Sequence, residues 1–358
     1  MKILHVCPRY YPSIGGVEEH VRNLCERLAR KHYVEVYTTD PSGKLSNLET
    51  INRVKVSRFR SFAPNEAYFF SSTLKKRLTT TSGDFDIVHA HNYGAFPAFY
   101  AAQGKAQNRL FLTPHYHGTG HTILRSLLHV PYRNFWGKSI FEKADVIVCV
   151  SKYEMGLIEK NFREFGEKMV LVPNGLNLGE FRNLERSKKK TRNILTVCRL
   201  ESYKGVQYLI QVLPILSENV SLKVVGKGPY KPNLIELVRK KKLDDRVEFF
   251  EDLPRGELLQ KYVDADVFVL LSEHESYGIS IAEALTAGTP CIVANKSALT
   301  EWVEDKSCQG IDFPFDLATL KRSIENAFVT GRIKSKLNIF DWDEVVEKIS
   351  SLYALSVG

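Results

Sequence analysis

Two glutamates with seven residues between them, Glu275 and Glu283, stand in the stretch LLSEHESYGISIAEALTAGTP at residues 270–290. Ionised carboxylates accept hydrogen bonds, and hydroxyl groups are natural donors to them. Gly278 lies between the two acids and opens a helix-like segment that ends before Gly288. The free N–H groups at such a helix start favour an anion, phosphate above all. The stretch therefore combines hydroxyl-binding acids with a phosphate-binding helix end.

An apolar strand, Val267 to Leu271, runs directly into this stretch and must position it. Open α/β sheets bind ligands outside the carboxyl ends of their strands, so Glu275 is expected in a ligand-binding loop. Glu283 follows Gly278 by just over one helical turn, and both acids can face one crevice. A phosphate between two hydroxyl-binding acids is the outline of a nucleotide-sugar site. Two solvated acids on a surface helix would give the same spacing.

Two cations stand at a comparable strand end in NILTVCRLESYKG. The strand Ile194 to Cys198 delivers Arg199, and Lys204 with Gly205 begins the next helix. A guanidinium and an ammonium placed in this way can grip a diphosphate from two directions. Without the strand and the helix, the same two residues would carry little information.

Glycines follow two other predicted strands. Gly15 and Gly16 end the loop PRYYPSIGGVE before a helix from Val17 to Arg30, and Gly226 and Gly228 follow the strand in LKVVGKGPY. Glycine lets a backbone come close to a ligand, although ordinary turn chemistry explains such residues equally well. The full GxGxxG fingerprint is absent, so NAD is not expected.

Histidines cluster at two further strand ends. His115 and His117 follow the strand in LFLTPHYHGTGH, and His89 and His91 lie in HAHNYGA. Residues two apart in extended backbone point the same way, so His115 and His117 could form a metal pair, but no third and fourth ligand is evident. His91 could line a ligand site at its strand end, whereas a core role for His89 is at least as good an interpretation.

These motifs together resemble the retaining GT-B glycosyltransferases of the family 4 type, whose E(x7)E element usually reads ExFGxxxxEAxAxGxP. Tyr277 replaces the usual Phe, while Gly278, Glu283, Ala284, Gly288 and Pro290 match the element. The segment VPNGLN is similar to the family's IPNGVD, with Asn177 in place of Asp. The resemblance covers nearly the whole chain, and the motifs follow the family's order.

The resemblance implies an α/β fold of the GT-B class, with two Rossmann-like doubly wound domains facing a central cleft. The expected domains are an acceptor-side domain at residues 1–180 and a donor-binding domain at 181–340, where a polar, basic run marks the boundary. A C-terminal helix at 341–358 is expected to pack back on the first domain.

The resemblance also implies roles for individual residues. Arg199 and Lys204 would neutralise the leaving diphosphate, Glu275 would bind sugar hydroxyls, and His115 would hydrogen-bond the sugar or the reacting hydroxyl. Glu283 would bind the ribose. The expected donor-binding set is Gly15, Gly16, Gly226, Gly228, Leu253, Ser276, Tyr277, Gly278, Ile279 and Glu283, and the expected acceptor-side residues are His91 and His117.

The implied activity is retaining transfer of a hexose (glucose, mannose or an N-acetylhexosamine) from a nucleotide diphosphate sugar to a lipid-linked or saccharide acceptor. No cofactor and no metal is expected. A GT-B phosphorylase or epimerase is one alternative, and the formation of free phosphate or of an epimer would favour it. A non-catalytic nucleotide-sugar-binding partner of a transferase is another, and a transfer assay would separate it from an enzyme.

Composition sets the cellular context. With 358 residues the chain can form two α/β domains, and its net charge of +9 is spread over small clusters without a nucleic-acid-binding motif. Six scattered cysteines without a CxxC pair favour a reducing, cytoplasmic location. Two segments, AYFFSSTLKKRL from Ala67 and TILRSLLHVPYRNFWGKSIF from Thr122, mix aromatic and basic residues. They are expected to cover a sheet or, alternatively, to touch the cytoplasmic face of a membrane.

Overall fold

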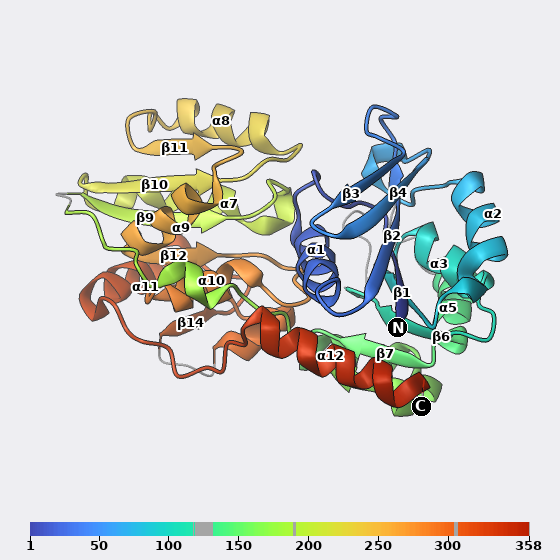
Figure 1. The fold of residues 1–358 in the computed structure, drawn as a ribbon. Coiled ribbons are helices and arrows are strands. Elements are labelled where there is room, and N and C mark those ends of the chain that lie inside the picture. Colours follow the sequence, from blue (N-terminus) through green and yellow to red (C-terminus); the bar gives the residue numbers. More distant parts are fainter. Residues whose placement is uncertain (117, 119–131, 189–190, 304–306, 358) are drawn as a thin grey trace. The chain divides into compact units, whose positions relative to one another are not determined.

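The computed structural model describes residues 1–116, 118, 132–188, 191–303 and 307–357. The chain separates into two compact units, Met1–Gly175 with Trp342–Gly358 and Leu176–Asp341 (Figure 1). The division falls five residues before the expected boundary at position 180, at the glycine of the PNG segment. Each unit has its own sheet and its own apolar core.

The described strands of the first unit form one eight-stranded sheet in the order β3-β4-β2-β1-β5-β6-β7-β8. They are β1 (Lys2–Val6), β2 (Tyr33–Asp40), β3 (Leu48–Ile51), β4 (Val54–Arg60), β5 (Ile87–His91), β6 (Arg109–Thr113), β7 (Val146–Cys149) and β8 (Met169–Leu171). Every neighbouring pair is parallel except β3 and β4. The antiparallel edge strand β3 was not expected, because its four residues alternate between exposed and half-buried and lack an apolar run.

Helices cover this sheet. They are α1 (Gly16–Leu28), α2 (Ser72–Thr81), α3 (Phe96–Gln103), α5 (Lys138–Lys143), α6 (Lys152–Asn161) and α12 (Trp342–Val357). The predicted helix from Val17 is present as α1, and it buries an apolar stripe that contains Val21, Leu24 and Leu28. The last helix, α12, belongs to this unit and packs against α1 (Figure 1).

The second unit has an all-parallel, six-stranded sheet in the order β11-β10-β9-β12-β13-β14. Its strands are β9 (Arg192–Val197), β10 (Val220–Val225), β11 (Val247–Phe250), β12 (Val267–Leu270), β13 (Cys291–Ala294) and β14 (Cys308–Ile311). Its helices are α7 (Val206–Val212), α8 (Lys231–Lys240), α9 (Arg255–Asp264), α10 (Ile279–Thr286) and α11 (Leu317–Thr330).

The strand order shows the point at which the chain begins to add strands to the other side of each sheet. In the second unit the chain builds outward from β9 to β10 and β11, then returns to the other side of β9 with β12. In the first unit the corresponding reversal falls between β1 and β5. Ligands of doubly wound sheets bind at the carboxyl ends of strands at these switch points. The prediction of two Rossmann-like α/β domains is confirmed. Within the described part of the chain, no helix has the length and apolar character needed to cross a bilayer.

Candidate functional site

The switch point of the second unit brings an ammonium and a carboxylate together. Lys204 ends a short 3₁₀ helix, Ser202–Lys204, after β9, and Glu275 lies in the loop after β12. Nζ of Lys204 lies 2.5 Å from Oε1 of Glu275, and the two side chains are only 11% and 17% exposed. A charged pair therefore sits where this sheet class binds its ligands.

Gly205 allows the loop after β9 to approach the end of β12. Its φ is 78°, in the left-handed region, and a Cβ atom on it would lie 2.4 Å from the carbonyl oxygen of Leu271. The N–H of Glu273 donates to the carbonyl oxygen of Tyr203 over 2.9 Å. Only glycine allows the two segments to come this close, because any side chain would collide with Leu271. Gly205 therefore makes it possible for the neighbouring Lys204 to reach Glu275.

The charge on Lys204 is stabilised by its partner. Burial acts to lower the pKa of Lys204, but the Glu275 carboxylate outweighs it and the pKa lies above its ordinary value. The ring of Tyr203, whose centroid is 5.1 Å from Nζ, adds a cation–π contact. A positive charge is thus held at the strand end in a largely water-excluded position, ready for an anion.

Arg199 lies in the same loop, where it contacts an acid of its own segment. Its Nε donates to Oε1 of Glu201 over 3.1 Å, and its side chain is 44% exposed. The two cations therefore share one strand end, but Arg199 reaches toward solvent whereas Lys204 is enclosed.

Gly226 and Gly228 allow the loop after β10 to pack closely on the loop after β9. A Cβ atom on Gly226 would lie 1.9 Å from the carbonyl oxygen of Cys198, and one on Gly228 would lie 2.2 Å from that of Leu200. The N–H of Leu200 also donates to the carbonyl oxygen of Lys227 over 2.7 Å. The expected close backbone approach exists, but its partner is the segment that carries Arg199, because the β10 loop packs directly on it.

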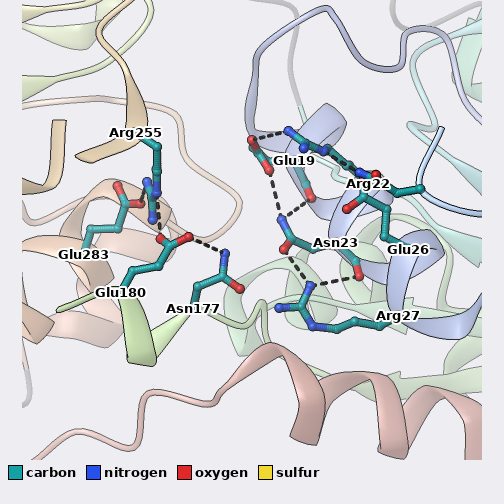
Figure 2. A network of polar contacts seen from close by, with 10 residues as sticks. Glu19, Arg22, Asn23, Glu26, Arg27, Asn177, Glu180, Arg255 and Glu283 are labelled. Atoms are coloured by element: carbon teal, nitrogen blue, oxygen red, sulfur yellow. Dashed lines mark hydrogen bonds and ion pairs between the residues drawn. The ribbon is translucent and has the colours of Figure 1, made fainter. Parts of the chain in front are cut away.

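Glu283 is held by an arginine that the sequence analysis missed. Arg255, at the start of α9, forms ion pairs with Glu283 and with Glu180, the latter at 2.9 Å between Nε and Oε2 (Figure 2). Nδ2 of Asn177 donates to the other oxygen of Glu180 over 3.3 Å. The side chain of Glu283 is 7% exposed, and a buried carboxylate without a cation would be costly. Arg255 supplies that cation.

The remaining donor-side candidates surround the start of α10. Gly278 precedes the helix with φ 97°, and a Cβ atom on it would lie 2.9 Å from Ile281 and close to Leu299. Tyr277 is buried, and its carbonyl oxygen accepts the indole N–H of Trp302 over 2.7 Å. Ser276, Ile279 and Leu253 are half-buried. The side chains packed around Gly278 leave no room for a Cβ atom, which accounts for the glycine. The hydrogen bond from Trp302 holds the backbone at the start of α10.

In the first unit, the glycine pair before α1 accommodates an acid. A Cβ atom on Gly15 would lie 2.3 Å from Oε2 of Glu18, and Gly16 is the first residue of the helix. Glu18 is buried and pairs with Nε of Arg9 over 2.7 Å. An acid in the first turn already compensates the positive helix end. An anion at this loop would therefore meet a carboxylate that is already in place.

The acceptor-side candidates belong to a cluster of histidines at the switch point between β1 and β5. His91 ends β5, and His115 follows β6 with φ 48°. Both are buried, with His5, His20 and His89 around them: ring centroids lie 4.3 Å apart for His89 and His91 and 5.1 Å apart for His20 and His115. His117 lies outside the described residues.

Hydrogen bonds hold the side chain of His89 and the backbone after His115 in place. Nδ1 of His89 lies 2.5 Å from the hydroxyl of Tyr353, and Nε2 lies 2.8 Å from Oγ1 of Thr113, so His89 is a core residue. The loop after His115 is held by the fully buried Glu154, whose Oε1 accepts the N–H of Tyr116 over 2.5 Å. The backbone at His115 is thereby kept in a left-handed conformation that is costly for a residue with a side chain.

Two family profiles match consecutive parts of the chain. "Glycosyltransferase Family 4" matches residues 14–180, and "Glycosyl transferases group 1" matches residues 179–329. An uncharacterised glycosyltransferase of Methanocaldococcus jannaschii is 27% identical, over 100% of this chain and 99% of its own length. The GDP-mannose:cellobiosyl-diphosphopolyprenol alpha-mannosyltransferase of Komagataeibacter xylinus is 23% identical, over 100% of this chain and 94% of its own. Among solved structures, sucrose-phosphate synthase of Thermosynechococcus elongatus matches with a TM-score of 0.81 and 19% identity, covering 99% of both chains.

Proposed function

The chain belongs to the GT-B glycosyltransferases of the family 4 type, and we propose that it is a retaining hexosyltransferase acting from a nucleotide diphosphate sugar. The acceptor in this proposal is lipid-linked or a saccharide, and the reaction needs neither metal nor cofactor. The observation that carries the proposal is the half-buried Lys204–Glu275 pair at the β9–β12 switch point. Nucleotide-sugar-dependent transfer is the activity of the family; retention and the hexose are the proposed refinements.

The pair suits the departure of a diphosphate. When the bond between the anomeric carbon and the phosphate oxygen breaks, the sugar gains oxocarbenium character and negative charge grows on the leaving group. Lys204 would stabilise this charge, because Glu275 keeps the ammonium protonated and burial keeps water from screening it. Arg199, on the same loop, would provide the second positive partner.

Retention follows if the acceptor hydroxyl attacks the face that the diphosphate leaves. The new glycosidic bond forms there, and the hydroxyl proton passes to the departing phosphate oxygen. No side-chain base and no metal is required by this route. Glu275 would accept hydrogen bonds from sugar hydroxyls, and His115 would hydrogen-bond the sugar or the attacking hydroxyl. These two roles rest on the family resemblance.

Glu283 would bind the ribose. Its Oε1 is engaged by Arg255, but an ionised carboxylate has about four acceptor positions, so capacity for two ribose hydroxyls remains. In this proposal Arg255 keeps the carboxylate in place and charged before the nucleotide arrives. The Komagataeibacter relative is named for GDP-mannose and for a diphosphopolyprenol acceptor, which favours a nucleotide donor and a lipid-linked acceptor here.

A lipid-linked acceptor would require contact with a membrane, and the first unit offers a surface for it. Phe135 and Trp136 are 74% and 40% exposed. Ring contacts continue from Trp136 to Phe96 at 6.0 Å and from Phe96 to Phe70 at 4.5 Å. The exposed basic residues 75–77 of α2 lie in the same unit. A unit that exposes both aromatic and basic side chains suits the interface of an anionic bilayer.

Vesicle binding tests the membrane contact. Trp136→Ser should weaken co-sedimentation with anionic vesicles, because it removes a large interfacial side chain. Val329→Ser is the matched control, since Val329 is 86% exposed on α11 in the other unit. Equal binding by both variants, or binding that ignores lipid charge, would contradict the contact.

Donor screening and product analysis test the activity. Thermal shift with UDP-, GDP- and ADP-sugars should identify one donor that stabilises the protein, and incubation with that donor and saccharide or polyprenol-linked acceptors should yield a glycoside. The anomeric coupling constant of the product should match the configuration of the donor. An inverted product would contradict retention, and donor binding without any transfer would indicate a non-catalytic partner.

A further inference from the structure

The strongest unassigned feature is the buried histidine cluster of the first unit. Three of its members come from separate segments: His20 from α1, His91 from the end of β5, and His115 from the loop after β6. One ring nitrogen of each lies within 4.8 Å of the corresponding nitrogens of the other two. The three residues are 3%, 0% and 7% exposed. Three imidazoles thus converge on one enclosed point.

A second set, His5, His89 and His91, lies equally close together, but its His89 is already hydrogen-bonded. Both nitrogens of His89 are hydrogen-bonded, one to Tyr353 and one to Thr113. A ligand at this second set would break existing bonds. The first set is therefore the better site.

The outer nitrogens of the first set are bonded in the pattern of ligating histidines. Nδ1 of His20 lies 2.7 Å from Oδ1 of Asn174; because an amide oxygen only accepts, Nδ1 carries the proton and Nε2 the lone pair. Nε2 of His91 lies 3.0 Å from Nδ1 of His5, and donation by His91 leaves its Nδ1 with a lone pair. Metal-bound histidines characteristically donate their other N–H to such a partner.

The inner nitrogens point to a ligand. Among the described residues, neither Nε2 of His20 nor Nδ1 of His91 has a hydrogen-bond partner. Buried polar atoms are seldom left in this state, because each costs about 1–3 kcal/mol of desolvation.

We propose that His20, His91 and His115 form a site for one divalent transition-metal ion of the zinc class. Three imidazoles with a fourth, open position are a known arrangement for zinc, with nitrogen–metal distances of about 2.0–2.1 Å. A tetrahedral ion at that distance requires ligand nitrogens about 3.4 Å apart. The three nitrogens lie within 4.8 Å of one another, so small rotations of the side chains would bring them to this spacing. The all-imidazole set selects Zn²⁺, Co²⁺, Ni²⁺ or Cu²⁺ over Mg²⁺ and Ca²⁺.

This inference goes beyond the proposed function, which requires no ion. An ion bound to His115 would take the imidazole that the proposed function assigns to the sugar or to the attacking hydroxyl. Ion binding is measured without donor or acceptor, so its failure would leave the transfer proposal untouched, and absence of transfer would leave the metal site untouched.

Cobalt titration of the tag-free, chelator-treated protein tests the site. One equivalent of Co²⁺ should produce the visible absorption of four-coordinate cobalt, and one equivalent of Zn²⁺ should abolish it. His20→Ala and His91→Ala should each weaken Zn²⁺ binding by at least about 100-fold, and Asn174→Ala by about 10–100-fold through the lost outer hydrogen bond. His32→Ala is the control, because His32 is half-buried outside the cluster and should leave binding unchanged.

Circular dichroism separates loss of binding from loss of fold. If an alanine variant unfolds, the spectrum of the cobalt-loaded wild-type protein still decides. Absence of a stoichiometric four-coordinate spectrum would overturn the proposal, as would equal Zn²⁺ affinity in His32→Ala and in folded His20→Ala.

Discussion

Acidification should destabilise the first unit, because its core contains imidazoles that resist protonation. Burial is the main reason that the pKa of His5 is lowered to about 3 and that of His20 to about 4, and it holds those of His89 and His91 well below their ordinary value. In the unfolded chain these groups have a pKa of about 6.5. Below that pH the unfolded chain binds protons that the folded chain does not bind. Stability is therefore present above pH 6.5 and is lost as the pH falls through it.

The magnitude follows from the difference in pKa. At pH 5, about 1.5 units below the unfolded value, each neutral imidazole costs about 2 kcal/mol of stability, since one pKa unit corresponds to about 1.36 kcal/mol. His5 and His20 together cost roughly 4 kcal/mol, and His89 and His91 act in the same direction. A typical domain is stable by about 5–15 kcal/mol, so the first unit should lose a large part of its stability at pH 5.

Urea denaturation at pH 7.5 and at pH 5, followed by near-ultraviolet circular dichroism, measures this loss. His5→Gln removes one titrating group and should reduce the difference in unfolding free energy between the two pH values by about 2 kcal/mol. His32→Gln is the control, because His32 is half-buried and should contribute much less. Equal unfolding free energies at the two pH values, or an unchanged difference in His5→Gln, would refute the reasoning.

Two substitutions in the second unit test the geometry of its site. Arg255→Ala should raise the KM for the donor by about tenfold with little change in kcat, measured by steady-state kinetics, because Glu283 would lose its counter-ion while the reacting groups remain. A fall in kcat alone would contradict a role in binding the nucleotide. Gly205→Ala should lower the unfolding free energy by about 1–3 kcal/mol or more, through left-handed strain and the 2.4 Å approach to Leu271. Gly256→Ala, with no atom within 4 Å of its Cβ position, is the control in denaturant titration, and equal effects would argue against the close packing.

The strand ends could be predicted from the sequence because each is a local pattern. An apolar run followed by a polar residue or a glycine located Lys204 after β9 and Glu275 after β12. The rule for parallel sheets then indicated that both lie at one edge. Their contact depended on the strand order, which places β9 next to β12, and on the conformation of Gly205.

Other features had no local signature. Arg255 and Glu283 are 28 residues apart and meet only when α9 and α10 pack side by side, so no spacing indicated their ion pair. His20 lies on the buried face of an amphipathic helix, where a single histidine indicates only a core position. Glycine motifs were also ambiguous. Gly226 permits close contact with another loop, and a glycine that contacts a ligand would look the same in the sequence.

The most direct test of the central claim is the affinity of the protein for its nucleoside diphosphate with and without the enclosed ammonium. Isothermal titration should compare the wild type with Lys204→Met and with Lys223→Met. The second variant removes a lysine of β10 that pairs with Glu248 of β11. We expect Lys204→Met to weaken diphosphate binding by about 100-fold or more, near 3 kcal/mol, and Lys223→Met to bind like the wild type. Wild-type affinity in Lys204→Met would contradict the assignment of the Lys204–Glu275 pair to the diphosphate.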